Sequence, residues 1–267
     1  MSILLFQLIV MRISALLIIF YYCLQNPATA QTGNQWNNKR AAVVLTYDDA
    51  LFVHLKNVAP ALDSLNLKGT FYLTCKEAAF TEHLKDWKRM ASNGHELGNH
   101  TLWHPCLGGP GREWVSADYD LRNYSVRRMK DEVRMTNVML RAVDGKSKRT
   151  FAYPCGDLRV HDSLYLDPKE FVAARGVEAK LIGRDEKELY NLSSFAVNNQ
   201  SGEELIKEVK RAIQEGKALV FLFHGVGGEH DLNVSLEAHR QLLHFLKAHE
   251  KEIWTTTFIE LAEWLKR

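Results

Sequence analysis

Two adjacent aspartates and a pair of histidines are the residues of this chain best suited to chemistry. Asp48 and Asp49 end an apolar run, and His100 and His104 follow further along. Two carboxylates at the mouth of a strand repel each other and lose solvation, so they need a cation or a proton between them. Two imidazoles four residues apart lie on one face of a helical turn and can bind one ion. With Asp49 as third ligand, the set is typical of a hydrolytic zinc or similar divalent site, and Asp48 is free to act on a water.

Each of these residues also has an ordinary structural explanation. An Asp-Asp pair can cap a helix, and because residues 50–52 open one here, Asp49 could cap and ligate at once. His224 follows the fully apolar run 218–223 and would usually be a core histidine with its hydrogen bonds satisfied. The glycines that follow it indicate instead a loop that opens at a site. We prefer the metal-site interpretation because Asp49 stands where a third ligand is needed.

From residue 41 onward, apolar runs of strand length alternate with segments of helical period. We expect strands at 41–47, 70–73, 95–100, 150–153, 218–223 and 253–257, and helices at 52–65, 82–90, 124–143, 203–215, 236–248 and 258–265. Repeated β-then-α units predict a single α/β domain over 41–267 with a parallel sheet, open or closed as a barrel. The candidate groups Asp48, His100, Pro154 and His224 all fall at carboxyl ends of strands, where α/β barrels place their sites.

Composition favours a folded enzyme over a nucleic-acid binder. Of the 267 residues, 46% are apolar, which is enough for one sizeable core. The 34 basic and 32 acidic residues are well mixed and leave a net charge of only +2. Because no basic stripe or tail is present, we expect no nucleic-acid partner.

The first thirty residues read as a secretory signal peptide. The run 13–24 is apolar, Arg12 precedes it, and Ala28 and Ala30 supply the small residues of a cleavage site. We therefore expect cleavage after Ala30, a flexible lead-in over 31–40, and a secreted or periplasmic protein with no stable membrane span. The alternative is an uncleaved anchor, although the apolar run is short for a full span.

Three cysteines remain after such cleavage: Cys75, Cys106 and Cys155. An odd number at irregular spacing does not describe a disulfide framework. One bridge is possible, but we expect buried or site-lining thiols. No Cys-x-x-Cys pair exists, so a cysteine-based zinc site is excluded.

Taken together, these motifs resemble those of the polysaccharide deacetylases, metal-dependent carbohydrate esterases built on a distorted (β/α)₇ barrel. Residues 46–49 (Thr-Tyr-Asp-Asp) match the first motif, in which the first aspartate is the general base and the second binds metal. Residues 100–104 match the second motif, with two metal histidines, and 222–224 match the fifth, whose histidine is the general acid. The resemblance covers about residues 40–265. It implies that barrel, an acetylated sugar or polysaccharide as partner, and one divalent ion, zinc before cobalt, nickel or manganese.

The chain departs from the family at two motifs. Where many members carry Arg-x-Pro-Tyr, residues 151–156 read Phe-Ala-Tyr-Pro-Cys-Gly, so Ala152 takes the arginine position and Cys155 the tyrosine position. No aspartate-tryptophan pair before residue 200 matches the fourth motif. In the family, the arginine orients the base and pairs with that aspartate. Because both the arginine and that aspartate are absent here, neither leaves the other as an unpaired buried charge, and we expect a coherent subfamily. How Asp48 is held remains open.

The sequence therefore predicts a metal-dependent hydrolase that removes acetyl groups from an N-acetylated sugar or glycan. Asp48 would take a proton from water, a backbone N–H near Cys155 would assist the oxyanion, and His224 would protonate the leaving amine. Tyr153 could stack on a sugar ring, and His95 and Glu96 could support the ligands from behind. The alternatives are an O-acetyl esterase of the acetyl-xylan type, a non-catalytic carbohydrate-binding relative and a non-sugar amidase. Three further residues near loops receive no role: Asp157, His161 and His230.

Overall fold

A curled sheet of parallel strands forms the centre of the protein. The computed structural model describes residues 35–267, and within them the sheet runs in the order β7, β4, β3, β2, β1, β9 and β8, with β12 also paired to β1. These eight strands are β1 Ala41–Asp48, β2 Thr70–Leu73, β3 Glu96–Asn99, β4 Thr150–Ala152, β7 Ala173–Arg175, β8 Phe195–Ala196, β9 Ala218–Phe223 and β12 Ile253–Thr256. Two short pairs lie apart from this sheet: β5 Arg159–Val160 with β6 Ser163–Leu164, and β10 Gly225–Val226 with β11 Asn233–Val234.

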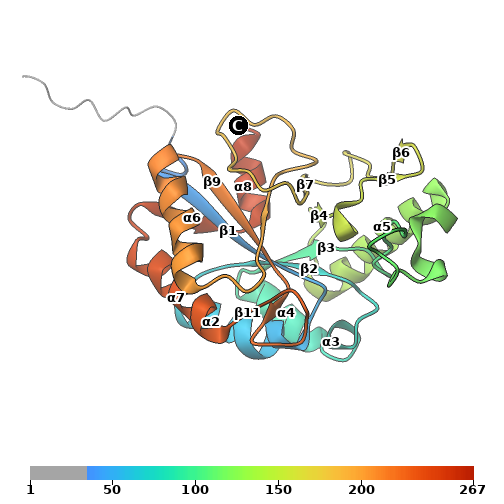
Figure 1. Cartoon of the computed structure of the whole chain (residues 1–267), viewed down its shortest axis with the longest axis horizontal. Coiled ribbons are helices and arrows are strands. Elements are labelled where there is room, and N and C mark those ends of the chain that lie inside the picture. The colour runs from blue at the N-terminus through green and yellow to red at the C-terminus, as the bar shows by residue number, and fades with distance from the viewer. Residues whose placement is uncertain (1–34) are drawn as a thin grey trace, which may run out of the picture. The chain divides into compact units, whose positions relative to one another are not determined.

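The first strand lies at the middle of the sheet and has three neighbours. On one side β9 pairs along it, and on the other β12 pairs with residues 41–44 and β2 with residues 46–48. Figure 1 shows β1 between β9 and β2. Every residue of β1 is buried, as expected for a parallel strand covered on both faces. The carboxyl end of β1, with Asp48, therefore emerges in the centre of one edge of the sheet.

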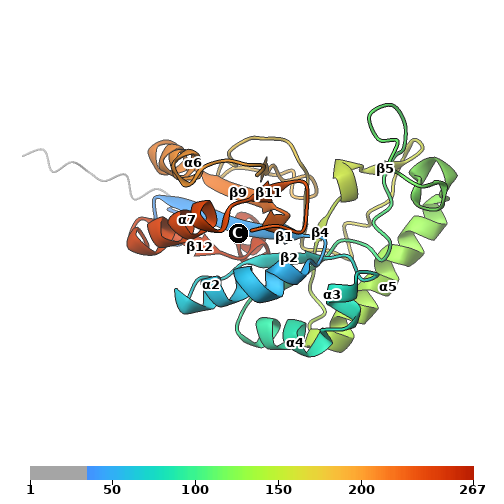
Figure 2. The ribbon, with the colours of Figure 1, turned by 60° about the horizontal axis from the view of Figure 1, so that its bottom comes forward.

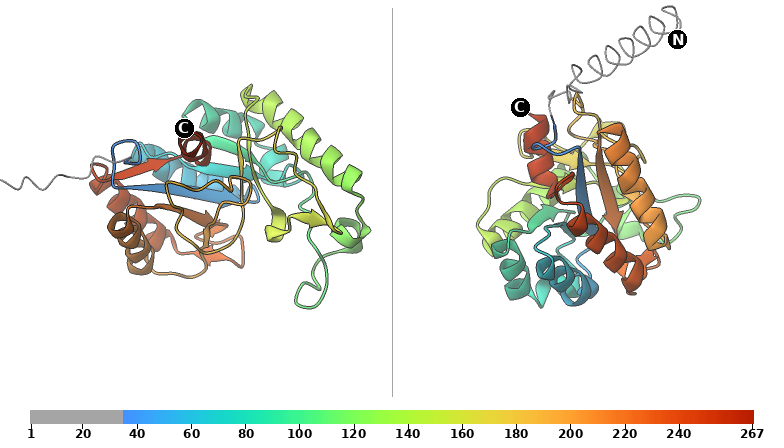
Figure 3. Two further views of the ribbon diagram at one scale, coloured as in Figure 1. Left: turned by 90° about the horizontal axis from the view of Figure 1, so that it is seen from above. Right: turned by 90° about the vertical axis from the view of Figure 1, so that its left-hand side faces the viewer.

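Helices pack against both faces of the curled sheet. Alternate β1 residues, such as Val43 and Leu45, pack in a core with α2 Ala59–Ser64, α4 Leu84–Ser92, α6 Gly202–Glu215 and α7 Leu236–Ala248. The intervening residue Val44 packs on the other face, against α8 Phe258–Leu265. The long helix α5 Val126–Asp144 runs along the side of the molecule away from α6 and α7 (Figures 2 and 3). This arrangement confirms the predicted α/β fold, as a barrel that is not closed between β7 and β8 in residues 35–267.

Local signals fix several helix boundaries. Ser201 and Glu204 form a reciprocal capping box at the start of α6, and Gly145 ends α5 with a left-handed φ of 74°. The predicted helix 52–65 contains a widened π turn, η1 His54–Val58, which the periodicity did not indicate. Its His54 ring nitrogen Nε2 lies 2.8 Å from the backbone carbonyl of His224, so this turn contacts the end of β9.

The segment expected as a flexible lead-in is packed where the structure describes it. The indole of Trp36 is fully buried, donates to the carbonyl of Gly216 at 2.9 Å and lies 4.5 Å from the ring of Trp264. The lead-in prediction is thus wrong from residue 35 onward, because this indole completes the core beneath α8. The signal peptide and the cleavage site after Ala30 lie outside the described residues. Among the helices of 35–267, none is long and apolar enough to cross a membrane.

Candidate active site

Apart from His95 and Glu96, the predicted site residues meet in one cavity at the carboxyl ends of the strands. Asp48 ends β1, His100 follows β3 and His224 follows β9, so parallel pairing brings them to the same edge. A cavity of about 700 Å³ lies there. It is lined by fourteen residues, Asp48, Asp49, His100, His104, Trp114, Tyr153, Cys155, Val177, Ala196, Leu222, His224, His230, Asp231 and Leu232.

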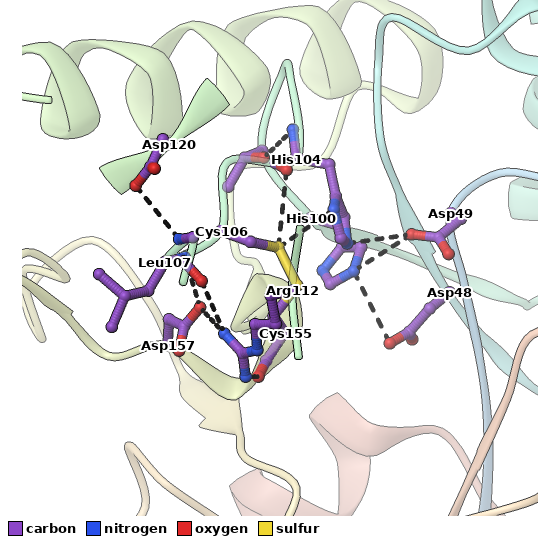
Figure 4. The surroundings of a disulfide bond; sticks show 12 residues. Asp48, Asp49, His100, His104, Cys106, Leu107, Arg112, Asp120, Cys155 and Asp157 are labelled. Atoms are coloured by element: carbon purple, nitrogen blue, oxygen red, sulfur yellow. Dashed lines mark hydrogen bonds and ion pairs between the residues drawn. A yellow bond between two sulfur atoms is a disulfide. The ribbon is translucent and has the colours of Figure 1, made fainter. Parts of the chain in front are cut away.

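Asp49, His100 and His104 form a compact set of potential metal ligands (Figure 4). Oδ1 of Asp49 lies 3.4 Å from His100 Nε2 and 3.3 Å from His104 Nε2. That oxygen is buried and has no hydrogen-bond partner among the described residues. His100 Nδ1 lies 2.8 Å from the carbonyl of Ala152, so in the neutral ring the unprotonated Nε2 faces Asp49.

This set fits a divalent ion. Ligand atoms about 2.0–2.1 Å from a tetrahedral zinc ion are about 3.3 Å apart, which agrees with the two measured separations. Nitrogen lone pairs that face an unpartnered carboxylate oxygen repel it unless a cation or proton lies between them. The remaining coordination position would be open to the cavity, as hydrolytic sites require.

The electrostatics of the site favour a charged Asp49 and a neutral His104. Burial alone would raise the pKa of Asp49, but His104 and His100 hold it well below its ordinary value. Burial lowers the pKa of His104 to about 4. Burial also acts to lower the pKa of His100, but Asp48 and Asp49 outweigh it and raise that pKa. A metal ion bound to this set therefore competes with a proton for Nε2 of His100.

The two histidines meet without a helix, contrary to the sequence argument. Residues 100–104 form a loop in which Thr101 and His104 adopt left-handed backbone angles, with φ of 68° and 55°. The loop is closed by its own hydrogen bonds: Thr101 N–H donates to the Asn99 side chain, and His104 N–H donates to the Thr101 hydroxyl, both at 2.9 Å. The i and i+4 spacing thus brings the rings together, with centroids 4.8 Å apart, through a tight turn.

Asp49 does not cap the helix that follows it, although the sequence allowed that alternative. The first N–H groups of this helix, at Phe52 and Val53, donate to the carboxylate of Glu229 at 3.0 and 2.7 Å. The N–H of Leu51 donates to the ring of His54. Because another acid takes the capping role, the Asp49 carboxylate is left for the ligand set.

Arg175 pairs with Asp48, the predicted base, and was missed by the sequence argument. Its guanidinium donates to Oδ2 of Asp48, both side chains are almost fully buried, and the Tyr72 ring lies 5.2 Å from the guanidinium carbon. In the β4–β7 register, Arg175 stands directly beside Ala152, the residue at the family's arginine position. Arg175 thus stands on the strand next to the one that carries the family's arginine position. The sequence feature that could have identified Arg175 is its place as a cation at the end of the short apolar run 173–174. That run is not among the predicted strands.

His224 faces the ligand set from the opposite wall of the cavity. Its Nε2 lies 3.9 Å from Oδ2 of Asp49, while its buried Nδ1 has no partner among the described residues. Burial lowers the pKa of His224, although Asp48 and Asp49 act in the opposite direction. The proton-donor role requires the protonated form of His224, which the two aspartates favour.

Cys106 and Cys155 form a disulfide (Figure 4), so the expectation of thiols is wrong for these two and holds for the buried Cys75. The bridge joins the loop after His104 to the turn after β4, and the sulfur of Cys106 lies 3.6 Å from His104 Nδ1. Arg112 strengthens the same junction by donating to Asp157 at 2.6 Å and to the carbonyl of Cys155 at 3.1 Å. The residues were visible in sequence, but their pairing required strands β3 and β4 to be neighbours.

We expect the double variant Cys106→Ser/Cys155→Ser to lose about 2–4 kcal/mol of unfolding free energy, because the bridge closes a long loop that the unfolded chain would otherwise explore. Urea unfolding of the variant and of the reduced wild type measures this. Cys75→Ala, which removes a thiol outside any bridge, is the control. An unchanged unfolding midpoint after reduction would contradict the expectation.

Cys155 and Tyr153 both line the cavity but differ in what they can do there. Cys155 lines the cavity with a left-handed φ of 56° and stays the predicted oxyanion donor. Tyr153 reaches the cavity, but its side chain packs in an aromatic cluster and its hydroxyl donates to the carbonyl of Tyr190, so stacking on sugar is not supported. Trp114 is 65% exposed at the cavity and is better placed for such a contact.

His95 and Glu96 do not support the ligands from behind, because they lie at the opposite end of β3. The ring of His95 contacts Gly69 N–H and Asp63, at 3.1 Å in both cases. Glu96 accepts from the hydroxyls of Thr70 and Thr150 and from a backbone N–H of α8. Both side chains therefore fasten the amino ends of the strands, away from the cavity.

Comparison with known proteins agrees with this geometry. Residues 36–166 match the sequence profile described as polysaccharide deacetylase. These residues belong to the polysaccharide deacetylase family. A curated protein from Bacillus subtilis, the uncharacterized protein YlxY, is 26% identical over 106 residues, which cover 40% of this chain and 28% of that protein. The chain thus spans less than a third of that relative.

Solved structures share the polysaccharide deacetylase fold with this chain. A protein from Mycobacterium smegmatis assigned as a polysaccharide deacetylase has a TM-score of 0.62 at 14% identity, covering 87% of this chain and 92% of its own. A protein from Bacillus anthracis described as a CE4 family pseudoenzyme has a TM-score of 0.52 at 20% identity, covering 84% and 66%. At such identities the likeness concerns the fold alone.

Proposed function

We propose that this polysaccharide deacetylase is an active, metal-dependent hydrolase that removes acetyl groups from an N-acetylated sugar or glycan. The observation that supports this best is the juxtaposition of the Asp49–His100–His104 set with a held carboxylate at Asp48 and a cavity-facing His224. Zinc is the proposed ion, because two imidazoles and one carboxylate suit it. We also propose secretion or export to the periplasm, on the strength of the signal-peptide pattern in residues 1–30.

The residues around the Asp49–His100–His104 set would supply a base, an oxyanion donor and an acid from two walls of the cavity. A divalent ion bound there would supply a Lewis acid and a water of lowered pKa. Asp48, oriented by Arg175, accepts the proton of the attacking water. The N–H of Cys155 donates to the developing oxyanion. His224 delivers a proton to the departing nitrogen or oxygen from the opposite side.

An amide substrate makes the fullest use of this arrangement. An amine leaves poorly unless it is protonated, so a base and a separate acid are both required, whereas an activated ester needs only the attack. The retention of Asp48, His224 and all three ligands also argues against a non-catalytic carbohydrate-binding relative. That alternative has support in the pseudoenzyme that shares the fold. O-acetyl esterase and non-sugar amidase activity would use the same groups with different substrate contacts.

The function is tested by acetate release from a panel of N- and O-acetylated glycans, with metal-free and zinc-loaded protein. We expect release from N-acetylated glycans only when zinc is present. Release from O-acetylated glycans alone would assign the esterase. Zinc binding without release from any glycan would favour a binding protein or the amidase, which a panel of cyclic amides then separates.

His224→Ala should lower the turnover of an N-acetyl glycan more than that of an activated aryl acetate. As general acid, His224 contributes about 10²–10⁴-fold when the leaving group is an amine, but much less when a nitrophenolate departs unaided. Steady-state rates on both substrates at matched zinc occupancy measure the difference. Equal losses on both would move His224 from proton donor to structural support.

A further inference from the structure

His230 lies in the cavity, although no motif of the family assigns it a role. Its ring stacks on His224, with centroids 4.6 Å apart and planes inclined by 14°. Its Nε2 lies 3.7 Å from Oδ2 of Asp49, and His224 Nε2 lies 3.9 Å from the same oxygen. The two oxygens of Asp49 thus face different partners, since Oδ1 faces His100 and His104 and Oδ2 faces this stacked pair.

The loop that carries His230 is fixed to the segment that carries Asp49. Strands β10 and β11 pair at its two ends, and Gly228 N–H donates to the Asn233 side chain at 2.9 Å. Glu229, next to His230, accepts the N–H groups of Phe52 and Val53. Because these N–H groups follow Asp49 within four residues, the loop cannot shift without moving the ligand segment as well.

The backbone also decides which nitrogen of His230 carries the proton. The N–H of Leu232 donates to Nδ1 of His230 at 2.9 Å. A backbone N–H can only donate, so Nδ1 is the acceptor and the proton of the neutral ring is on Nε2. That nitrogen can donate to Asp49 but cannot at the same time ligate a metal. This argues against a second ion held by Asp49, His224 and His230, which their spacing alone would allow.

We propose that His230 is a positioning residue with two actions: it donates its Nε2–H to Oδ2 of Asp49, and its ring supports that of His224. The proposal rests on the proposed function, because Asp49 must ligate the metal and His224 must be the proton donor. Carboxylates that bind metals are generally held by such outer donors, and removing one costs about 10–100-fold in metal affinity. The present 3.7 Å separation is long for a hydrogen bond, as is common in ligand-free sites. His224 needs the support because its Nδ1 has no partner among the described residues.

Three replacements separate the two actions. His230→Phe keeps a flat ring and loses the donor, His230→Gln keeps an N–H donor and loses the ring, and His230→Ala loses both. His249→Phe is the matched control, because His249 also stacks on a ring, that of Phe245 at 4.0 Å, and does not line the cavity. Zinc affinity is measured by chelator competition. The ratio of N-acetyl glycan to aryl acetate turnover is measured at saturating zinc.

We expect zinc affinity to fall about 10–100-fold in the Phe and Ala variants and to change little in the Gln variant. The turnover ratio should fall in the Gln and Ala variants and persist in the Phe variant. Wild-type zinc affinity in His230→Phe would overturn the donor role, and an unchanged ratio in His230→Ala would overturn the stacking role. If the wild type binds zinc but releases no acetate from glycans, the proposed activity fails, and the affinity comparison still decides the donor role. A wild type that binds no zinc would refute both proposals.

Discussion

Asp48→Asn is expected to retain zinc and to lower acetate release by about 10²–10⁴-fold, the usual contribution of a positioned base. Asp49→Asn, one residue further along, should instead weaken zinc binding itself. The reason is geometric, because Oδ1 of Asp49 lies about equally far from His100 and His104, whereas Asp48 is engaged by Arg175 and lies 3.8 Å from His100 Nε2. Zinc content after dialysis and turnover at saturating zinc separate the two effects.

His100→Ala supplies the reference for a lost ligand in this comparison. It should release zinc as Asp49→Asn does, and more completely, because an alanine offers no donor atom. Equal zinc loss in Asp48→Asn and Asp49→Asn would mean that the roles of the two aspartates are assigned wrongly. Thermal unfolding of each variant shows whether a loss comes from the site or from the fold, since Asp48→Asn leaves the Arg175 charge without its carboxylate.

Arg175→Met should abolish most turnover and destabilise the protein by about 3–5 kcal/mol, because it leaves the Asp48 carboxylate buried without its cation. Both side chains are almost fully buried, so solvent compensates little for the lost partner. The consequence for catalysis follows from orientation, since the base then lacks the donor that fixes Oδ2. Urea unfolding and acetate release measure the two losses separately.

The register of the sheet offers a rescue of this variant. Ala152 and Arg175 are directly paired on β4 and β7, and side chains paired across parallel strands point to the same face. The double variant Ala152→Arg/Arg175→Met should therefore recover part of the turnover, by placing the guanidinium at the position where many members of the family carry an arginine. Arg175→Lys is the control for charge without the planar fork. Full activity in Arg175→Met would contradict any role for this arginine.

The sequence alone determined the features that local interactions encode. The apolar period of residues 236–248 and 258–265 predicted two helices to the residue, because each buries one stripe and begins at its own cap. The strand ends at Asp48 and His224 were equally visible, because fully apolar runs stop abruptly at polar residues. Since parallel strands end at one edge, these residues could be assigned to a single site before any contact was known.

Tertiary structure decided every feature that depends on which segments become neighbours. The Cys106–Cys155 bridge needs the loops after β3 and β4 to meet, and an odd cysteine count hides it. The cation of Arg175 replaces the one absent at Ala152 only because β7 lies beside β4. Glu229 caps a helix that starts far away in sequence, and in doing so frees Asp49 and fixes His230. A spacing of residues records local geometry alone, whereas these contacts cross the sheet and exist only after the whole chain has folded.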